Sequence, residues 1–551
     1  MAQDLAQRGP CVAFIFESVN ITAAGACVSM AGTNDTLIVG PGVSLETTGQ
    51  SAAIWAGNLA TTDLIDIYGP VFGYDGIDYF SPNSNVTLFV NYGDAITADV
   101  GNGLALLGGA TITTYGAISG LNSGITIGHG TINNYGTIVT PVQNYSPASP
   151  AAIVVNQYAT INNYGSVANI AFTATSNYGN NSVLNTGSIN AILTTSNSPE
   201  QLAVVNTGKI SQYVELSGGS LVNGGSIGTP SLGNGAAISS ASTLYGTTLV
   251  NDGAIYGSIA LNDAGGADVV DSTYGSITGQ IILGSTATGV VIGGQTGGTI
   301  IGGSGADVLY ANPTLAAVNN SAKTTLDGSA GNNWLYGDAA YTIFDSGDNV
   351  TGDYNLIFGG ASQMLGVAGY TNNTVDYANL SAGYHSAYID LRDGYTFMST
   401  AAHAVSATQS QLVFEDYLYD IPNVIGSSGA DVVICDNGVD KITVGAGNVG
   451  GDVLYGGSGA SSQDTFVFTS LSQSPLTNAA AVEGFKIGVD KIDLSALNLP
   501  PADFGIVYGG NGYASILVEK NPSVGFNSAT DMIISVAAST SAAITAKDLI
   551  L

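Results

Sequence analysis

The stretch that decides the fold is residues 426–443, which read GSSGADVVI and then CDNGVDKIT. These are two nine-residue units in phase, and residues 302–310 (GGSGADVLY) form a third. Glycines mark a turn, an aspartate follows, and a large aliphatic residue comes two positions later. Glycine permits positive φ and a close ligand approach, and the aliphatic side chain points inward from a short strand. The carboxylate and the turn carbonyls are hard oxygen donors that suit Ca²⁺. The spacing predicts stacked parallel strands whose turns bind calcium.

These units resemble the haemolysin-type (RTX) calcium-binding repeat, G-G-x-G-x-D-x-U-x, where U is a large aliphatic residue. Residues 482–497 (VEGFKIGVDKIDLSAL) look like the C-terminal β-roll cap of serralysin-type secreted proteins, without the protease. The ending at 547–551 (KDLIL) is similar to many type I secretion signals. The resemblance covers roughly residues 263–551. It implies a parallel β-roll, bound Ca²⁺, and export from a Gram-negative bacterium through an uncleaved C-terminal signal.

The resemblance also implies which aspartates meet, because two units make one turn of a β-roll. We expect Asp431 to pair with Asp452 and Asp440 with Asp464. Asn333 and Asn355 stand where aspartate is expected; they keep an oxygen but lose the charge, so there we favour a turn cap over a ligand. Capping alone is also the alternative at the aspartates. The candidate calcium ligands are Asp268, Gly303, Gly305, Asp307, Asn333, Asp338, Gly429, Asp431, Gly438, Asp440, Gly447, Asp452, Gly457, Gly459 and Asp464.

The N-terminal half carries a longer repeat of the form polar-x-Gly-x-aliphatic. Its turn glycines lie at positions 93, 116, 136, 165, 187, 208, 225 and 253, a mean spacing of 160/7, about 23 residues. This period predicts the rungs of a parallel β-solenoid. Asparagines before the turn should donate and accept along a ladder. Tyrosines recur just before the glycine at 68, 92, 115, 135 and 164. They either stack on one another or bind glycans or a partner, and we favour self-stacking.

The chain is therefore expected to be all-β, a parallel β-solenoid (β-helix) followed by an RTX calcium-binding parallel β-roll. Residues 1–262 are assigned to the solenoid and 263–360 to transitional and degenerate RTX repeats. Residues 361–425 are assigned to an RTX-associated insertion, 426–499 to the calcium-binding roll and its cap, and 500–551 to the secretion signal region.

Charge excludes several classes of function. Nine Lys and Arg stand against 40 Asp and Glu, a net charge of −31, which is not the footprint of a nucleic-acid binder and disfavours an anionic membrane. No apolar run of about 18 residues predicts a transmembrane helix, so we expect no membrane insertion. Three cysteines form no disulfide framework. Cys11 and Cys27 either form one bridge or are two small buried side chains.

Catalytic groups are sparse. The three histidines, His129, His385 and His403, form no H-E-x-x-H motif. Acidic candidates in the solenoid, such as Asp94 and Glu215, fall at unrelated rung phases, although a glycosidase needs only two carboxylates. We expect a non-enzymatic protein at the cell surface or outside the cell that assembles with itself as an S-layer, sheath or matrix filament subunit, with cell-surface polysaccharide as a further partner. A calcium-dependent adhesin is the second hypothesis, and a polysaccharide-modifying β-helix enzyme is the third.

Overall fold

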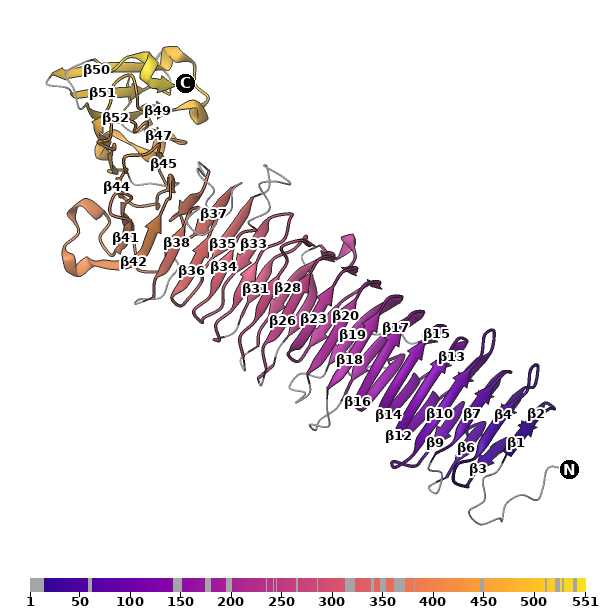
Figure 1. Cartoon of the computed structure of the whole chain (residues 1–551). Coiled ribbons are helices and arrows are strands. Elements are labelled where there is room, and N and C mark those ends of the chain that lie inside the picture. The colour runs from indigo at the N-terminus through magenta and orange to yellow at the C-terminus, as the bar shows by residue number, and fades with distance from the viewer. Residues whose placement is uncertain are drawn as a thin grey trace. The chain divides into compact units, whose positions relative to one another are not determined.

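The computed structural model describes residues 14–57, 62–141, 151–173, 180–194, 201–233, 235–240, 242–243, 245–263, 266–284, 286–312, 323–337, 341–346, 353–360, 372–380, 382–445, 450–510, 513–520, 526–527, 530–538 and 543–551. Within these ranges the chain is all-β and contains no α-helix (Figure 1). Short 3-10 turns are η1 (Pro230–Leu232), η2 (Ala404–Ser406), η3 (Gln409–Gln411), η4 (Leu471–Gln473), η5 (Leu476–Asn478), η6 (Ser495–Leu497), η7 (Pro501–Asp503) and η9 (Ala546–Asp548). The chain divides into two compact units, residues 1–280 and 281–551.

Unit 1 is a parallel β-solenoid whose rungs contribute to three strand ladders. Ladder 1 contains β1 (Phe14–Glu17), β4 (Thr36–Val39), β7 (Leu64–Ile67), β10 (Asn85–Val90), the second parts of β12 (Asn102–Thr114), β14 (Ser123–Asn134) and β16 (Ile153–Asn163), then β18 (Asn181–Asn185), β20 (Leu202–Asn206), β23 (Gly219–Asn223), β26 (Thr247–Asn251) and β29 (Val269–Asp271).

Ladder 2 contains β2 (Ile21–Ala23), β5 (Leu45–Thr47), β8 (Val71–Gly73), β11 (Ala95–Ala98), β13 (Ala117–Gly120), β15 (Thr137–Val139), the first parts of β17 (Ser166–Phe172) and β19 (Ser188–Thr194), then β21 (Lys209–Ile210), β24 (Ser226–Gly228), β27 (Ala254–Tyr256) and β30 (Ser276–Ile277). Ladder 3 contains β3 (Val28–Met30), β6 (Ile54–Ala56), β9 (Ile77–Tyr79), the remaining parts of β12, β14, β16, β17 and β19, then β22 (Val214–Leu216), β25 (Ala236–Ser240) and β28 (Ser258–Leu261).

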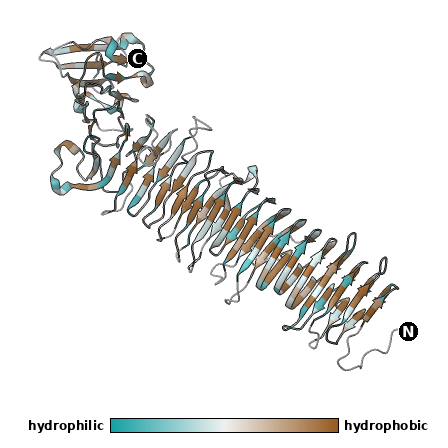
Figure 2. Ribbon diagram, in the orientation of Figure 1, coloured by the Kyte–Doolittle hydropathy of each residue, from teal (hydrophilic) through white to brown (hydrophobic). Residues whose placement is uncertain are grey.

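The core of unit 1 follows from strict alternation along each strand. In ladder 1, Ile112, Ile132 and Ile161 lie in register and are fully buried. Their neighbours on either side point outward, because successive side chains in a strand face opposite sides. Figure 2 shows the apolar stretches on the strands of both units. A single rung cannot bury its apolar face alone, so each rung depends on the rungs above and below it.

The repeated turn glycine of the solenoid is required by space. A Cβ at Gly136 would overlap the carbonyl oxygen of Gly116, and a Cβ at Gly165 would overlap that of Gly136. The same conflict repeats for the later turn glycines of the repeat, at 187, 208, 225 and 253. Gly93 differs, because its φ is +87° and no atom lies close to where its Cβ would be. Glycine at these positions therefore lets the backbones of consecutive turns pack directly against each other.

The predicted asparagine ladder is present and buried. Nδ2 of Asn134 donates to Oδ1 of Asn163, and Nδ2 of Asn163 donates in turn to Oδ1 of Asn185. The same bond repeats through Asn206 and Asn223 to Asn251, and each bond is 2.7 Å long. All six side chains are fully buried. Amides that donate and accept at once satisfy polar groups that would be costly to bury unpaired.

The tyrosine ladder is shorter than the sequence predicts. The rings of Tyr115, Tyr135 and Tyr164 stack with centroids 4.8 and 4.7 Å apart, so self-stacking is confirmed for these three. Among the described residues Tyr68 and Tyr92 enter no ring stack, and Tyr92 is 91% exposed. The different turn at Gly93 explains why Tyr92 leaves the column.

Unit 2 is a parallel β-roll with two sheets. Sheet A contains β31 (Ile281–Leu283), β33 (Gly298–Ile301), β35 (Thr324–Asp327), β37 (Thr342–Asp345), β39 (Thr374–Asp376), β43 (Asn423–Ile425), β45 (Lys441–Thr443), β47 (Thr465–Val467), β49 (Lys491–Asp493) and β53 (Leu549–Ile550). Sheet B contains β32 (Val290–Ile292), β34 (Val308–Tyr310), β36 (Asn333–Tyr336), β38 (Asn355–Phe358), β42 (Leu412–Tyr419), β41 (Tyr395–Ser399), β40 (Ser386–Asp390), β44 (Val432–Ile434), β46 (Val453–Tyr455), β48 (Ala480–Phe485), β52 (Met532–Ala538), β51 (Tyr513–Val518) and β50 (Phe504–Gly510).

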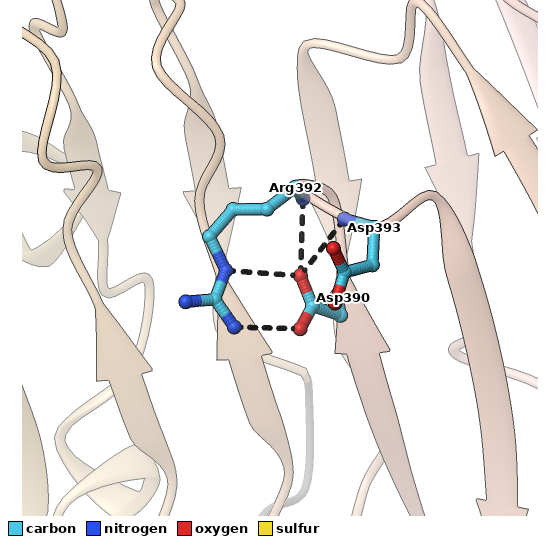
Figure 3. A network of polar contacts seen from close by, with 3 residues as sticks. All are labelled: Asp390, Arg392 and Asp393. Carbon is cyan, nitrogen blue, oxygen red and sulfur yellow. Dashed lines mark hydrogen bonds and ion pairs between the residues drawn. The ribbon is translucent and has the colours of Figure 1, made fainter.

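Sheet B is interrupted by an antiparallel meander, β40–β41–β42, between β38 and β44. The turn from β40 to β41 is fixed by Asp390, whose buried carboxylate accepts from Nε and Nη2 of Arg392 and from the backbone N–H groups of Arg392 and Asp393 (Figure 3). The bidentate pair is 2.8 Å at its shortest. It is the only ion pair among the described residues.

The fold class predicted from the sequence is confirmed: the chain is all-β, with a parallel solenoid and a parallel roll. The three-ladder pattern of unit 1 continues through β29 and β30, past the expected end of the solenoid at residue 262. The domain boundaries stay predictions. None of the helical segments in the described ranges has the length and apolar character needed to cross a membrane.

Candidate metal centre

One edge of unit 2 carries a row of aspartate and asparagine side chains where the chain enters sheet B. Asp307 precedes β34, Asn333 and Asn355 begin β36 and β38, and Asp416 lies in β42. The backbone N–H of Asp307 donates to Oδ1 of Asn333 (2.9 Å), and Nδ2 of Asn333 donates to Oδ1 of Asn355 (3.0 Å). The N–H of Asn355 donates to Oδ1 of Asp416 (3.0 Å). The row links consecutive rungs, and all four side chains are buried.

The same edge continues with Asp431 and Asp452, before β44 and β46. The N–H of Asp431 donates to Oδ1 of Asp452 at 2.8 Å, so the structure brings together the pair expected from the sequence. The Asp431 carboxylate accepts from N–H (2.6 Å) and Oγ (2.5 Å) of Ser427 and from N–H of Ala387 (2.7 Å). Burial raises its pKa to about 6 despite these hydrogen bonds.

The opposite edge, where the chain enters sheet A, carries a second row. Asp440, Asp464 and Asp490 precede β45, β47 and β49. The N–H of Asp440 points at Oδ1 of Asp464 (3.4 Å), and the N–H of Asp464 donates to Oδ1 of Asp490 (3.0 Å). Asp548 extends the row by accepting from the N–H of Gly488 at 2.7 Å. The second expected pair, Asp440 with Asp464, is therefore also brought together.

Within the second row, Cys435, Asp440 and Asp464 form a buried cluster whose ligand atoms lie within 4.8 Å of one another. Burial, followed by the charges of Asp436 and Asp464, raises the pKa of Asp440 to about 8. Burial and the surrounding carboxylates also raise the pKa of the Cys435 thiol well above its usual value. When these side chains are ionised they repel one another, and a bound cation would neutralise part of their charge.

The donor set fits Ca²⁺. Carboxylate oxygens are the hard ligands that calcium prefers, whereas the protonated thiol of Cys435 is not a calcium ligand. Each carboxylate oxygen keeps acceptor capacity beyond the turn hydrogen bond that it already makes. Asp440 and Asp464 at one edge, and Asp431 and Asp452 at the other, would hold the ions together with turn carbonyls. Bound Ca²⁺ would supply the countercharge that these buried carboxylates lack.

Lys486 is the exception at the end of the roll. Its Nζ donates to the carbonyl oxygen of Gly459 at 2.6 Å. Burial raises the pKa of Asp490, and the charge of Lys486 offsets a part of that rise. The ammonium thus occupies one turn carbonyl of a predicted ligand residue. The last rung has a cation of its own, and we expect calcium to be less important there.

The aspartates also cap turns, as the alternative interpretation requires. Asp307 accepts from N–H of Gly303 (2.6 Å), and Asp440 from N–H of Asp436 (2.8 Å), in each case four residues earlier. Asp464 accepts from N–H of Gly457 (2.7 Å), because three extra residues lengthen that turn. A carboxylate can cap a turn and bind a metal with different lone pairs, so the turn hydrogen bonds neither require nor exclude a metal. Ligation by the candidate residues therefore stays a prediction.

The glycines of the RTX-like turns divide into two groups. Gly331, Gly451 and Gly488 have the positive φ that glycine permits, whereas the predicted positions Gly303, Gly305, Gly429, Gly438, Gly457 and Gly459 lie outside that region. Space explains three of them: a Cβ would overlap the carbonyl oxygen of Ala287 at Gly305, of His385 at Gly429 and of Asp436 at Gly457.

Three predicted positions stand apart. Asp268 lies in unit 1 before β29 and accepts from N–H of Thr247 at 2.9 Å, while Oγ1 of Thr247 donates to Asp263. The structure therefore groups Asp268 with Asp263, another buried carboxylate. Asp338 and Gly447 lie outside the described residues, as does Cys11. Cys27 donates its thiol to the carbonyl oxygen of Glu46 at 3.1 Å.

Sequence reasoning missed several members of the two rows. Asp490 could have been found, because Gly488-Val489-Asp490-Lys491-Ile492 keeps the Gly-x-Asp-x-aliphatic pattern. Asp416 carried no such signal, since it lies 61 residues after its partner Asn355 and follows the meander. Burial raises the pKa of Asp416 to about 6.

The geometry of unit 2, a two-sheet parallel roll with carboxylates at both edges, agrees with the comparison of the chain with known families. Residues 416–547 match the family model described as Peptidase M10 serralysin C terminal. The resemblance stated for this region is thus confirmed. Such domains are RTX calcium-binding β-rolls typical of type I secreted proteins, which suggests Ca²⁺ as the metal and an extracellular location. A search among curated proteins found no match.

Proposed function

We propose that the protein is a secreted, calcium-binding structural protein that assembles with itself at the surface of a Gram-negative cell, as an S-layer, sheath or extracellular filament or matrix subunit. The observation that carries the proposal is the organisation of both units. Each consists of stacked rungs with an apolar core, and unit 2 carries two rows of buried carboxylates at its edges. Cell-surface polysaccharide is the candidate anchor, and we propose no catalytic activity.

Calcium is the proposed switch for folding and assembly. Burial raises the pKa of Asp431 and Asp440, so the ionised carboxylates destabilise the folded chain unless a cation is bound. Metal binding of this kind is coupled to folding. A net charge of −31 also makes copies of the chain repel one another. Calcium removes both obstacles, and moderate NaCl does not, because salt screens attraction as well as repulsion.

Negative-stain microscopy of the purified full chain tests the proposal. At millimolar calcium we expect regular sheets or filaments, and after chelation with EGTA we expect them to dissolve. Sedimentation velocity over a wide concentration range gives the same answer in solution. A monodisperse monomer under both conditions would refute self-assembly.

A calcium-dependent adhesin is the second candidate, and the exposed stack of Tyr115, Tyr135 and Tyr164 favours it. The ring faces within this stack cover one another, so a glycan would bind through the three tyrosine hydroxyl groups, which hydrogen-bond as donors and acceptors. Isolated rods that bind a glycan array, and lose binding when Tyr135 is replaced by serine, would support this function. A reducing-sugar assay on acidic and neutral polysaccharides tests the third candidate, a β-helix enzyme.

A further inference from the structure

The outer surface of sheet B in unit 2 is apolar where an exposed sheet should be polar. The inward residues of β34, β36, β38 and β42 are Leu309, Leu335, Ile357 and Leu418, and all are buried. The outward positions of the same strands are also apolar. An exposed face of a sheet normally alternates with polar residues. A second apolar face on this stretch requires a partner to cover it.

Two columns make up this surface, which we call the aromatic face. The stacked column contains Tyr310, Tyr336, Phe358 and Tyr419, and the outer column contains Val308, Trp334, Leu356 and Tyr417. Each column occupies one register position on four neighbouring strands. The strands β34, β36, β38 and β42 follow one another in the roll (Figure 1).

The stacked column shows which kind of partner fits. Its ring centroids are 4.5, 4.7 and 4.8 Å apart, and neighbouring planes differ by 8–9°. The rings therefore cover one another's faces; Tyr336, in the middle of the column, is only 8% exposed, and Tyr419 at its end is 42% exposed. Sugars stack on ring faces, so this column is a poor platform for a glycan. A row of ring edges is instead suited to interdigitate with side chains of another sheet packed about 10 Å away.

The size of the aromatic face is sufficient for self-association. Trp334 is 48% exposed, and Tyr417 and Tyr419 are each 42% exposed. Large aromatic side chains present about 150–250 Å² each, so the eight residues leave roughly 400–500 Å² of apolar surface. That is near the largest patch found on an ordinary monomer, about 300–600 Å². Two such faces would bury roughly 800–1,000 Å², which approaches the lower bound of a specific interface.

Charge argues for a second copy of the same chain. Neither column contains an acidic or basic residue, although the chain carries −31. Contacts along the carboxylate rows would place like charges together, whereas the aromatic face brings none. We propose that the aromatic faces of two copies pack against each other in an isologous, two-fold contact. This inference rests on the proposed self-assembly and names the surface that mediates it.

Paired substitutions in the full chain test the interface. Trp334→Ser with Tyr417→Ser removes the most exposed part of the outer column and leaves the stacked column intact. Val205→Ser with Val222→Ser is the matched control, because these residues of unit 1 are 40% and 42% exposed. In millimolar calcium, sedimentation velocity should show at least a tenfold higher concentration for half-association in the first variant and no change in the control. Circular dichroism checks that both variants fold.

A second measurement, tryptophan fluorescence, uses a variant in which the aromatic face is unaltered. The chain has two tryptophans, Trp55 and Trp334, so Trp55→Phe makes Trp334 the sole reporter. Its emission should shift to the blue, and iodide quenching should fall, as association proceeds. If the native chain never associates, the proposed function fails and the interface with it. If it associates while Trp334 stays quenchable, or the double variant associates normally, the interface is wrong and self-assembly stands.

Discussion

Replacing Asp431 by asparagine should change stability little without calcium and reduce it with calcium. The pKa of Asp431 is raised to about 6 from a usual value of 3.8. The stability that this group contributes is therefore fully present below about pH 4 and is lost as pH rises through 6. Two pH units correspond to about 3 kcal/mol. At pH 8 in EGTA, Asp431→Asn removes this penalty.

The substitution also has a cost, because Ala387 and Ser427 donate their N–H groups to different oxygens of Asp431. The amide nitrogen replaces one of these oxygens and cannot accept, so one of the two donors is left unpaired. An unsatisfied buried donor costs about 1–3 kcal/mol. The two effects nearly cancel, so in EGTA the variant should be within about 2 kcal/mol of the native chain. In calcium, a site saturated 100-fold above its Kd contributes about 2.7 kcal/mol. The variant should lose this contribution, and more if Asp452 shares the ion.

Thermal unfolding of the full chain in EGTA and in millimolar calcium measures the difference. For a unit of this size, 1 kcal/mol corresponds to about 2–4 °C, so the calcium-induced rise in Tm should fall by roughly 5–10 °C. Asp390→Asn is the control, because it breaks the pair with Arg392 and should destabilise equally in both conditions. Calorimetric titration should show that Asp431→Ala weakens calcium binding more than Asn333→Ala. An undiminished calcium-induced rise in Asp431→Asn would mean that this aspartate only caps its turn.

Three further outcomes are expected. Asn163→Ala should destabilise unit 1 by about 2–4 kcal/mol, because Asn163 is a fully buried member of the ladder. Asn162→Ala should cost less than about 1 kcal/mol, because Asn162 is partly exposed. Hydrogen exchange over β16 and β18 measures both losses of stability, and equal losses would contradict the ladder. In EGTA, the melting temperature should fall as pH rises from about 4 to about 8, since the pKa of Asp440 is raised to about 8; a rise would invert the predicted sign. Deleting residues 500–551 should abolish export without reducing expression, as immunoblots of medium and cells would show, and secretion of the truncated chain would exclude a type I signal there.

The parts of the fold that recur at short range were predictable. The glycine spacing gave the solenoid, and the asparagine before each turn gave the buried ladder, because both recur in every rung from Asn134 to Asn251. The pairs Asp431–Asp452 and Asp440–Asp464 followed from a two-unit turn. In each case one rung differs little from the next, so residues at regular spacing in the sequence occupy equivalent positions on neighbouring rungs.

The parts that depend on irregular insertions were not predictable. The stacked column joins Tyr310, Tyr336, Phe358 and Tyr419, which are separated by 26, 22 and 61 residues. No period connects these numbers, and only the pairing of the strands reveals the column. The same holds for Asp416, which reaches its row after the antiparallel meander. The role of each RTX-like glycine was not predictable either, since Gly305, Gly429 and Gly457 serve close packing while Gly331 and Gly488 have positive φ.

The asparagine ladder also has a direction. Every Nδ2 donates to the rung that follows in sequence; the last, of Asn251, ends on Oγ of Ser272 (2.9 Å), and the first Oδ1, of Asn134, accepts from N–H of Gly136 (3.1 Å). The amide dipoles are therefore aligned along the stack and polarise one another. A stack growing toward the N-terminus exposes an unpaired carbonyl, whereas one growing toward the C-terminus exposes an unpaired N–H, which proteins tolerate less. Rungs should thus add more readily at the N-terminal side, which makes the solenoid a polar template for its own folding.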